Sequence, residues 1–254
     1  MKIGFIGQGW IGRHYADDFE ARGLSVVRYS RDPQYLANKD AIADCDIVFI
    51  AVPTPTTPKG FDDSIVREVV KLVGKGHVAV IKSTIVPGTT QSIQKDNPDI
   101  FVFHSPEFLT EATAAHDAAH PNRNIIGIPM DDEGARQKAR EVLEVLPDAP
   151  YEKIMSANDA ELVKYAGNCF LFTKVMYMNI LYDLIHSVGG DWDNVREALI
   201  HDPRIGKSHT NIVHQSNNQS NRGRGAGGHC LIKDFEAYRN EHKRGRRRHQ
   251  TVPV

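Results

Sequence analysis

The sequence is poor in cysteine and contains no long apolar run, and both shortages restrict what it can be. Its 254 residues include three cysteines, and none belongs to a CxxC pair or another metal-ligand spacing. An odd number of widely separated cysteines argues against a disulfide framework and for a reducing compartment. No apolar stretch approaches the roughly 20 residues that a membrane-spanning helix needs, and residues 1–5 show a strand pattern rather than a signal peptide. We therefore expect a cytoplasmic protein with no metal and no membrane partner.

An excess of charge of one sign is also missing. The formal net charge is −1, with 41% hydrophobic and 25% charged residues, which is typical of a globular protein with core enough for one large or two modest domains. The net charge indicates nothing about partners by itself, and we expect no nucleic-acid partner. Basic residues gather only in residues 239–249, which we interpret as a solvated tail, with diphosphate binding as the alternative.

A glycine-rich turn follows the first strand pattern. Residues 2–6 are apolar, Gly7, Gly9 and Gly12 form a GxGxxG pattern, and a helical pattern continues to about residue 22. In this setting the first glycine makes a tight turn, the second lets the backbone approach a pyrophosphate, and the third lets helix pack on strand. The helix N-terminus would then face the phosphates. The motif predicts dinucleotide binding, and a purely structural turn is the alternative.

Further strand patterns alternate with helical ones, which predicts an α/β fold with a Rossmann-type, doubly wound parallel sheet and helices on both faces. Two strands end in Thr/Pro turns, with Pro53 and Thr54 in VPTPT and Thr84 in KSTIVPG. Such a sheet binds its ligand at the carboxyl ends of its strands, so these turns are coenzyme-contact candidates unless they are simple connections. The strand patterns lie at residues 25–30, 46–52, 77–82, 101–104, 124–128 and, as a possibility, 151–155.

A possible acid–base pair follows the strand at 101–104. Ser105 and Pro106 are good first residues for a helix, which would place Glu107 and Glu111 one turn apart on the same face. Neighbouring carboxylates repel, so one could keep its proton and serve in acid–base chemistry. A solvated helix face is the alternative interpretation.

The longest expected element is an apolar helix over residues 159–189, preceded by a capping pattern at Ser156. About thirty residues would span roughly 45 Å, which favours a helix that joins domains or packs against its copy in a homodimer. Lys164 and Asn168 are four residues apart on it and share one face. We expect them to line a polar pocket, although a lysine on an apolar helix can also simply reach water.

The stretch from Gly225 to Asp234, GAGGHCLIKD, suits neither a core nor a helix. Three glycines in four residues indicate backbone that approaches a ligand closely or takes positive φ. Cys230 lies there beside polar neighbours, which makes it a candidate nucleophile. A buried, inert cysteine is the alternative, and that description suits Cys169 and Cys45 better. The Asn/Ser/Gln-rich residues 208–224 before it are expected to form a mobile loop, and residues 235–241 a short helix.

Taken in order, these motifs resemble the UDP-glucose/GDP-mannose dehydrogenase family. The resemblance runs from residue 1 to about 238 and implies a Rossmann domain over 1–155, a long central helix with a small helical catalytic and dimerisation domain over 156–238, and a basic tail over 239–254. The matching blocks are GFIGQGWIG, VFIAVPTPT, IKSTIVPGT, SPEFLTEATAAHDAAHPNR, AELVKYAGNCFLFTK, DPRIG and GAGGHCLIKD.

This resemblance implies two NAD-dependent hydride transfers that take a sugar's primary alcohol through an aldehyde to a carboxylate. Cys230 would attack the aldehyde and later carry a thioester, and Lys164 and Asn168 would stabilise the oxyanion. Asp234 and Thr84 would hold a catalytic water, with Glu107 assisting hydrolysis. Further implied contacts are Trp10, Ile11, Glu111 and Lys233 toward the coenzyme, and Phe108, Leu109, Gly227 and, across the dimer, Arg204 toward the substrate.

Three departures from the family pattern qualify these implications. Family members continue with a further α/β domain that binds the nucleotide, and nothing in residues 1–254 corresponds to it, so weak or tail-dependent substrate binding is expected. Ile232 replaces the usual proline after the cysteine turn, and the polar loop before Gly225 is longer than usual. A one-step hydroxyacid or 6-phosphogluconate-type dehydrogenase and a non-catalytic nucleotide-binding remnant are the competing hypotheses.

The end of the second strand bears on the choice of coenzyme. An NAD-binding unit places an acidic residue there, about 20 residues past the glycines, to accept the ribose hydroxyls. Here Ser30 and Arg31 follow the strand, and the nearest acid, Asp32, comes next. Ser30 and Arg31 can both bind a 2′-phosphate, so the local chemistry admits NADP. The resemblance implies NAD, with Asp32 turning back toward the ribose as a further possibility.

Overall fold

The computed structural model describes residues 1–57, 60–110, 112–214, 223–227 and 231–239. The chain divides into two compact units, Met1–Lys164 and Tyr165–Val254, which are taken here one at a time. Among the described residues, no helix combines the length and the apolar character needed to cross a membrane.

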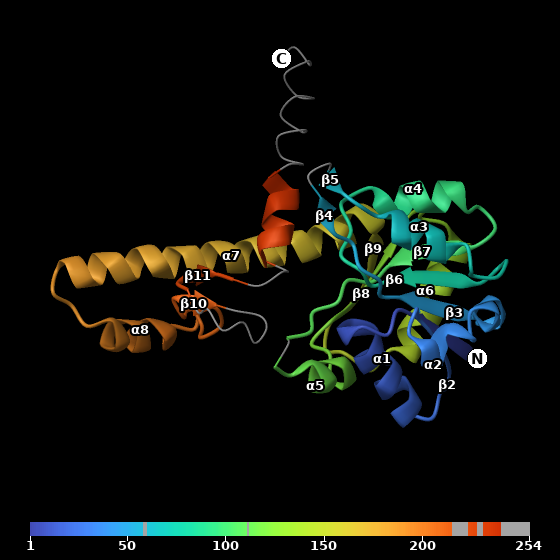
Figure 1. Ribbon diagram of the computed structural model, residues 1–254, viewed down its shortest axis with the longest axis horizontal. Coiled ribbons are helices and arrows are strands. Elements are labelled where there is room, and N and C mark those ends of the chain that lie inside the picture. The colour runs from blue at the N-terminus through green and yellow to red at the C-terminus, as the bar shows by residue number, and fades with distance from the viewer. Residues whose placement is uncertain (58–59, 111, 215–222, 228–230, 240–254) are drawn as a thin grey trace, which may run out of the picture. The chain divides into compact units, whose positions relative to one another are not determined.

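The first unit is built on a seven-stranded sheet with the order β2-β1-β3-β6-β7-β8-β9 (Figure 1). Neighbouring strands from β2 to β7 are parallel, which confirms the expected Rossmann-type arrangement for this part. The strands are β1 (Lys2–Ile6), β2 (Ser25–Tyr29), β3 (Ile47–Ile50), β6 (Val78–Ile81), β7 (Phe101–His104), β8 (Asn124–Ile128) and β9 (Glu152–Ser156).

The sheet departs from the expected parallel arrangement at β8, which pairs with β7 in the antiparallel sense, while β9 is parallel to β8. The connection between β7 and β8 contains one short helix, α5 (Ala114–Ala119). The change of direction at β8 leaves the rest of the sheet parallel.

Helices cover both faces of this sheet (Figure 1), and the strands alternate accordingly. Ile3 and Phe5 of β1 belong to one core cluster, with residues of α1, α5 and α6, whereas Ile6 belongs to a second cluster with residues of α3 and α4. Side chains on a strand point to opposite faces in turn, so strands buried on both sides are almost continuously apolar. The helices are α1 (Trp10–Ala21), α2 (Pro33–Leu36), η1 (Asp40–Asp44), α3 (Ser64–Val70), α4 (Thr89–Asp96) and α6 (Glu133–Val145), beside a small hairpin of β4 (Thr56–Thr57) and β5 (Gly60–Phe61).

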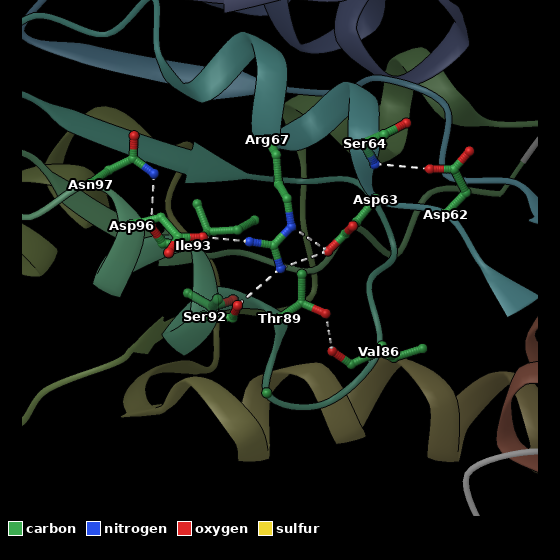
Figure 2. Close-up of polar contacts among 12 residues, drawn as sticks. Asp62, Asp63, Ser64, Arg67, Val86, Thr89, Ser92, Ile93, Asp96 and Asn97 are labelled. Atoms are coloured by element: carbon green, nitrogen blue, oxygen red, sulfur yellow. Dashed lines mark hydrogen bonds and ion pairs between the residues drawn. The ribbon is translucent and has the colours of Figure 1, made fainter.

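Polar contacts join α3 to α4. Figure 2 shows the Arg67 guanidinium of α3 held by Asp63 at 3.0 Å and reaching Ser92 at 3.0 Å and Asp96 at 2.9 Å, both on α4. Arg67 is only one-third exposed, and a planar guanidinium with several partners has a defined orientation. The contact therefore fixes α4, and with it the KSTIVPG segment that precedes this helix.

The helix predicted to begin at Ser105 is absent. Residues 105–110 have no regular structure, and α5 starts at Ala114. The Glu107 carbonyl accepts a hydrogen bond from Lys164, and its carboxylate accepts one from the backbone N–H of Leu109. A helix would need that carbonyl for the N–H of residue 111, so the tertiary contact replaces the helical one. The shared helical face of Glu107 and Glu111 is therefore also wrong, and residue 111 lies outside the described residues.

The long helix is confirmed as α7 (Ala157–Ser187), within two residues of the predicted ends. Its N-terminus has the predicted cap, because the Ser156 hydroxyl accepts from the Asp159 N–H at 3.1 Å. Its residues up to Lys164 belong to the first unit and the remainder to the second.

The second unit continues from α7 into α8 (Trp192–Ile200), which Asp191 caps. A short parallel pair follows, β10 (Val213–His214) with β11 (Gly225–Ala226), so the expected irregular loop at 208–224 is wrong at β10. Residues 215–222 lie outside the described residues. Residues 231–239 are helical, four residues earlier than predicted, and Phe235 stacks on Phe172 of α7 at 4.3 Å. This stacking packs the helix against α7, and its helical residues include Lys233 and Asp234.

Candidate active site

The glycine loop after β1 has the geometry that the sequence predicts. Gly7 has a φ of +92°, and a Cβ there would lie 2.2 Å from the Ala51 carbonyl oxygen. A Cβ on Gly12 would lie 1.9 Å from the Gly7 carbonyl oxygen, whereas a Cβ on Gly9 would meet nothing within 4 Å. Gly7 and Gly12 are therefore needed for the fold, and Gly9 faces open space.

The N-terminus of α1 is also available to an anion. Gly9 caps it without a side-chain hydrogen bond, and no acidic residue occupies the first turn. Free N–H groups and the positive end of the helix dipole favour a phosphate there. Trp10 is partly exposed at this position and Ile11 packs on the core. The loop thus fits the pyrophosphate of a dinucleotide.

At the end of β2 an acidic group lies close to Ser30. The Ser30 hydroxyl donates to the Asp32 carboxylate at 2.8 Å and accepts from the Asp32 N–H at 3.1 Å. Arg31 is exposed and lies 3.9 Å from Glu68. The end of β2 itself has no acidic residue, but Asp32 places a carboxylate beside Ser30, two residues further along the chain.

Three consecutive residues after β6 tie together the loops at the carboxyl ends of neighbouring strands. The Ser83 hydroxyl donates to the Val52 carbonyl at 2.7 Å, and the Thr54 hydroxyl donates to the Thr84 carbonyl at 2.8 Å. Thr54 is buried by this contact, whereas Pro53 beside it is exposed. Lys82, in turn, donates to Ser105, at 3.1 Å from its hydroxyl oxygen. The loops after β3, β6 and β7 are thus fixed against one another.

Glu107 and Lys164 form a buried ion pair within the first unit. The Lys164 ammonium donates to Glu107 Oε1 at 2.7 Å and to the Glu107 carbonyl at 2.8 Å. Both side chains are at least nine-tenths buried. Because the Leu109 N–H donates to Oε2 at 2.8 Å, both carboxylate oxygens are satisfied. Charge-assisted bonds of this kind orient both groups firmly.

The two residues after Glu107 pack beside this pair. The Arg123 guanidinium lies 3.7 Å from the Phe108 ring centroid, and the Lys164 ammonium lies 5.9 Å from it. Leu109 is partly buried against the core cluster that includes Phe5. The segment is therefore ordered by its side chains, although it is not helical.

In the second unit Asn168 is paired with Asp234. The Asn168 amide donates to Asp234 Oδ2 at 2.6 Å, and the Asp234 side chain is 1% exposed. Asp234 Oδ1 lies 3.2 Å from the Lys233 ammonium but has no described group in hydrogen-bond geometry. A buried carboxylate oxygen in this position can accept a hydrogen bond from a water or a substrate hydroxyl.

Two other predicted substrate contacts belong to the second unit. The Gly227 N–H donates to the His214 carbonyl at 2.6 Å, which continues the β10–β11 pairing. Arg204 is mostly exposed and is held by Asp202, at 2.6 Å between the closest charged atoms. Its guanidinium is therefore presented at the surface rather than buried.

Cys230, the predicted nucleophile, lies outside the described residues. The other two cysteines are unsuited to that role. Burial raises the pKa of Cys45, and burial together with the nearby Asp234 carboxylate raises the pKa of Cys169 to about 11. Neither is a thiolate near neutral pH, and the thiolate is the reactive form.

Two sequence profiles of one family match this chain. That of the UDP-glucose/GDP-mannose dehydrogenase family, NAD binding domain, matches residues 34–146, and that of the same family's central domain matches residues 158–252. The chain belongs to this family. The glycine loop precedes the first matched range, so its assignment depends on the geometry described above.

Individual relatives agree with the family assignment. A UDP-glucose 6-dehydrogenase of Rhizobium meliloti (strain 1021) is 34% identical over 210 residues, covering 77% of this chain and 46% of the relative. One from Pseudomonas aeruginosa is 33% identical over 290 residues, covering 93% and 60%. A solved UDP-glucose dehydrogenase from Pyrobaculum islandicum superposes with a TM-score of 0.80 at 29% identity, covering 96% and 64%. This chain spans about half the length of the curated relatives that it matches.

Sequence reasoning missed two buried charged residues of this family member. The fully buried Glu161 of α7 accepts hydrogen bonds from the N–H groups of Gly88 and Thr90 and from the Thr90 hydroxyl, at 2.6–2.8 Å. It caps α4 from another element, and burial raises its pKa against the opposing hydrogen bonds. Lys82, 3% exposed, is the second. Each stands in a block that carried the family resemblance, but only the tertiary structure reveals its partners.

Proposed function

We propose that this chain forms the coenzyme-binding and catalytic part of a nucleotide-sugar dehydrogenase. The reaction would oxidise the primary alcohol of a sugar nucleotide to the carboxylate, as the names of the UDP-glucose 6-dehydrogenase relatives suggest. The observation that carries this proposal is the buried Asn168–Asp234 pair, whose Oδ1 can accept one more hydrogen bond. Asp234 stands four residues after Cys230, so a water-holding carboxylate follows the proposed nucleophile closely.

The coenzyme would be NAD, held at the glycine loop, at Pro53 and Thr54, and at Thr84. When bound, NAD would supply the hydride acceptor, with one NAD molecule reduced in each of the two oxidations. Asp32, placed by Ser30, supports NAD because a carboxylate accepts from the ribose hydroxyls and repels a 2′-phosphate. Arg31 keeps NADP as a second candidate. Glu111 and Lys233 would complete the coenzyme contacts.

Cys230 would act as the covalent nucleophile. Its thiolate attacks the carbonyl carbon of the intermediate aldehyde, which gives a thiohemiacetal, and the second oxidation leaves the acyl group on sulfur as a thioester. Lys164 suits stabilisation of the oxyanion, because among the described residues Glu107 takes two of its three N–H donors, which leaves one for the oxyanion. Asn168 likewise keeps one amide N–H beyond the one given to Asp234. Fixed donors of this kind stabilise developing negative charge.

Hydrolysis of the thioester needs a positioned water and a group that takes its proton. We assign the water to Asp234 and Thr84. Water attacks the thioester carbon, the C–S bond breaks, and the thiolate of Cys230 is restored while Glu107 assists the proton transfers. Phe108, Leu109, Gly227 and Arg204 would contact the sugar nucleotide.

We also propose that the chain works as a homodimer through α7. Apolar side chains that are more than half exposed recur at helical spacing on one face of α7: Phe170, Tyr177, Ile180 and Leu184, followed by Val188 just after the helix. An apolar stripe on a long helix can meet its own copy about a two-fold axis. Arg204, exposed at the surface, would then reach the substrate of the partner.

The test is a measurement of stoichiometry. Purified protein is given NAD and millimolar UDP-glucose, and reduced coenzyme is counted against sugar nucleotide consumed. Two reduced coenzymes and one sugar acid per substrate support the proposal. One per substrate, in an enzyme that remains active after iodoacetamide, would identify a one-step dehydrogenase. Coenzyme binding without turnover on UDP-glucose or GDP-mannose would identify a binding remnant.

A further inference from the structure

Lys82 is a buried lysine that the mechanism above does not use. It follows β6 directly, and its side chain is 3% exposed. Its ammonium nitrogen lies 3.1 Å from the Ser105 hydroxyl oxygen, 3.5 Å from the Ser105 carbonyl oxygen and 4.3 Å above the Tyr15 ring centroid. Within the described residues no carboxylate is within ion-pair distance of it.

This arrangement is unfavourable for stability. Burying an ammonium group costs several kcal/mol unless a counter-charge and hydrogen bonds compensate. A neutral hydroxyl and an aromatic face compensate only in part. Lys164 is ion-paired with Glu107, whereas Lys82 has no carboxylate partner among the described residues. A methionine of similar shape would avoid this cost, so stability alone does not account for a lysine here.

The position of Lys82 indicates what the charge does. Ser83 and Thr84 bind the loop after β3, and Lys82 binds the loop after β7 through Ser105. Ser105 precedes Glu107 by two residues, and the Glu107 carboxylate is the charged group that acts favourably on the Lys82 ammonium. Lys82 therefore both anchors the segment that carries Glu107 and adds a second positive charge near its carboxylate.

We propose that Lys82 is a positioning residue that holds the 105–110 segment, through Ser105 and by its charge, so that Glu107 stays seated on Lys164. This inference deepens the proposed function and rests on it for the catalytic role of Glu107. Lys82 itself touches neither the substrate nor the coenzyme in this assignment.

The experiment compares wild type with Lys82→Met, Lys82→Arg and the matched control Lys75→Met. Lys75 is an exposed lysine of the first unit, 79% exposed and 3.5 Å from Asp99. Hydrogen exchange is followed in the peptide covering residues 105–110, whose Leu109 N–H donates to Glu107. Coenzyme affinity, kcat, KM and thermal stability are measured on the same samples.

We expect exchange in residues 105–110 to become at least about tenfold faster in Lys82→Met, with exchange in α6 unchanged. We expect kcat to fall by at least about tenfold at unchanged coenzyme affinity, because Glu107 is misplaced rather than the fold lost. Lys82→Arg should recover most of both effects, and Lys75→Met should match wild type. The thermal midpoint of Lys82→Met should equal or exceed that of wild type.

Unchanged exchange in residues 105–110 of Lys82→Met would overturn the inference whether or not the protein oxidises sugars. So would a general rise in exchange with a lower thermal midpoint, because Lys82 would then be merely structural. Equal impairment of the Met and Arg variants would show that side-chain fit, not charge, is responsible. If wild type oxidises no sugar nucleotide but the local exchange change is present, the proposed function fails and the anchoring by Lys82 stands.

Discussion

The Lys164 ammonium donates to two atoms of one residue, the carboxylate and the carbonyl oxygen of Glu107, at 2.7 and 2.8 Å. The first contact neutralises a buried charge, and the second replaces the helical hydrogen bond that the backbone would otherwise make. Lys164 thus supplies the counter-charge for the Glu107 carboxylate and also holds the backbone at Glu107 in a non-helical conformation. Either residue alone would be a buried, uncompensated charge.

We therefore expect Lys164→Met to lower the free energy of unfolding by roughly 3–5 kcal/mol, since it leaves the Glu107 carboxylate buried without a cation. Glu107→Gln leaves the Lys164 ammonium buried without an anion, so it should cost a similar amount, about 3–5 kcal/mol. Urea denaturation followed by circular dichroism measures both. The Lys164→Met/Glu107→Gln double variant should be more stable than the sum of the losses predicts, and strict additivity would contradict direct coupling.

Cys230→Ser should abolish formation of the sugar acid and leave coenzyme binding intact, because a serine hydroxyl is a far weaker nucleophile at neutral pH. Cys169→Ser is the control. The pKa of Cys169 is raised to about 11, so its thiol is not the reactive species and the variant should keep its activity. Acid formation by Cys230→Ser at the wild-type rate would rule out the covalent mechanism.

Local patterns predicted most of the first unit. The structural roles of Gly7 and Gly12 could be predicted from the sequence. At each position a neighbouring backbone carbonyl occupies the space that a Cβ would need, so only glycine fits. Strands such as β7 and β8 match their predicted residues because they are buried on both faces, which gives continuous apolar runs.

Features that depend on distant contacts could not be predicted in this way. Ser105 and Pro106 have good helix-starting propensities, yet Lys164, 57 residues after Glu107, takes the carbonyl that the helix needs. Lys82 and Glu161 have no local signal, since a lysine after a strand and a glutamate on a helix are usually solvated. Their roles follow from burial against segments that are far away in sequence.

The α7 stripe predicts the oligomeric state. Ile180→Asp places a charge at the middle of the proposed dimer face, where Ile180 is 67% exposed. The dissociation constant of the dimer should therefore rise by at least about 100-fold. Leu36→Asp, at an exposed apolar position of α2, should leave assembly unchanged. Sedimentation at micromolar concentration measures both, and a wild-type monomer would count decisively against the proposed dimer.

The contact between Ser30 and Asp32 predicts coenzyme preference in two directions. Ser30→Asp adds a carboxylate at the strand end and should shift preference toward NAD by at least about tenfold, equivalent to roughly 1.4 kcal/mol. Asp32→Asn removes the existing one and should shift it toward NADP. Binding of both coenzymes is measured by titration, with Ser25→Asp, at the other end of β2, as control. No change in either variant would place the ribose away from this turn.

Lys82 predicts how stability varies with pH. Burial lowers its pKa from 10.5 to about 8, with Glu107 opposing the shift; Tyr15, His104 and Lys164 are the other titratable groups around it. Between about pH 8 and pH 10 the Lys82 side chain is therefore protonated in the unfolded chain and largely deprotonated in the folded protein. Unfolding then takes up a proton, so stability gained from this group rises with pH between about 8 and 10.5.

Below pH 8 the destabilisation by Lys82 is present in full, so Lys82→Met should be more stable than wild type at pH 7. At about 1.4 kcal/mol per pKa unit the gain in unfolding free energy is at most about 3.5 kcal/mol, less roughly 1 kcal/mol for the lost Ser105 hydrogen bond. The gap should close as pH rises toward 10, because wild type then releases the proton while the variant has none to release. Urea unfolding of both proteins at pH 7, 8.5 and 10 measures this gap, in which the other lysines and tyrosines cancel. A difference that is constant over this range would mean that Lys82 is not buried as a charge.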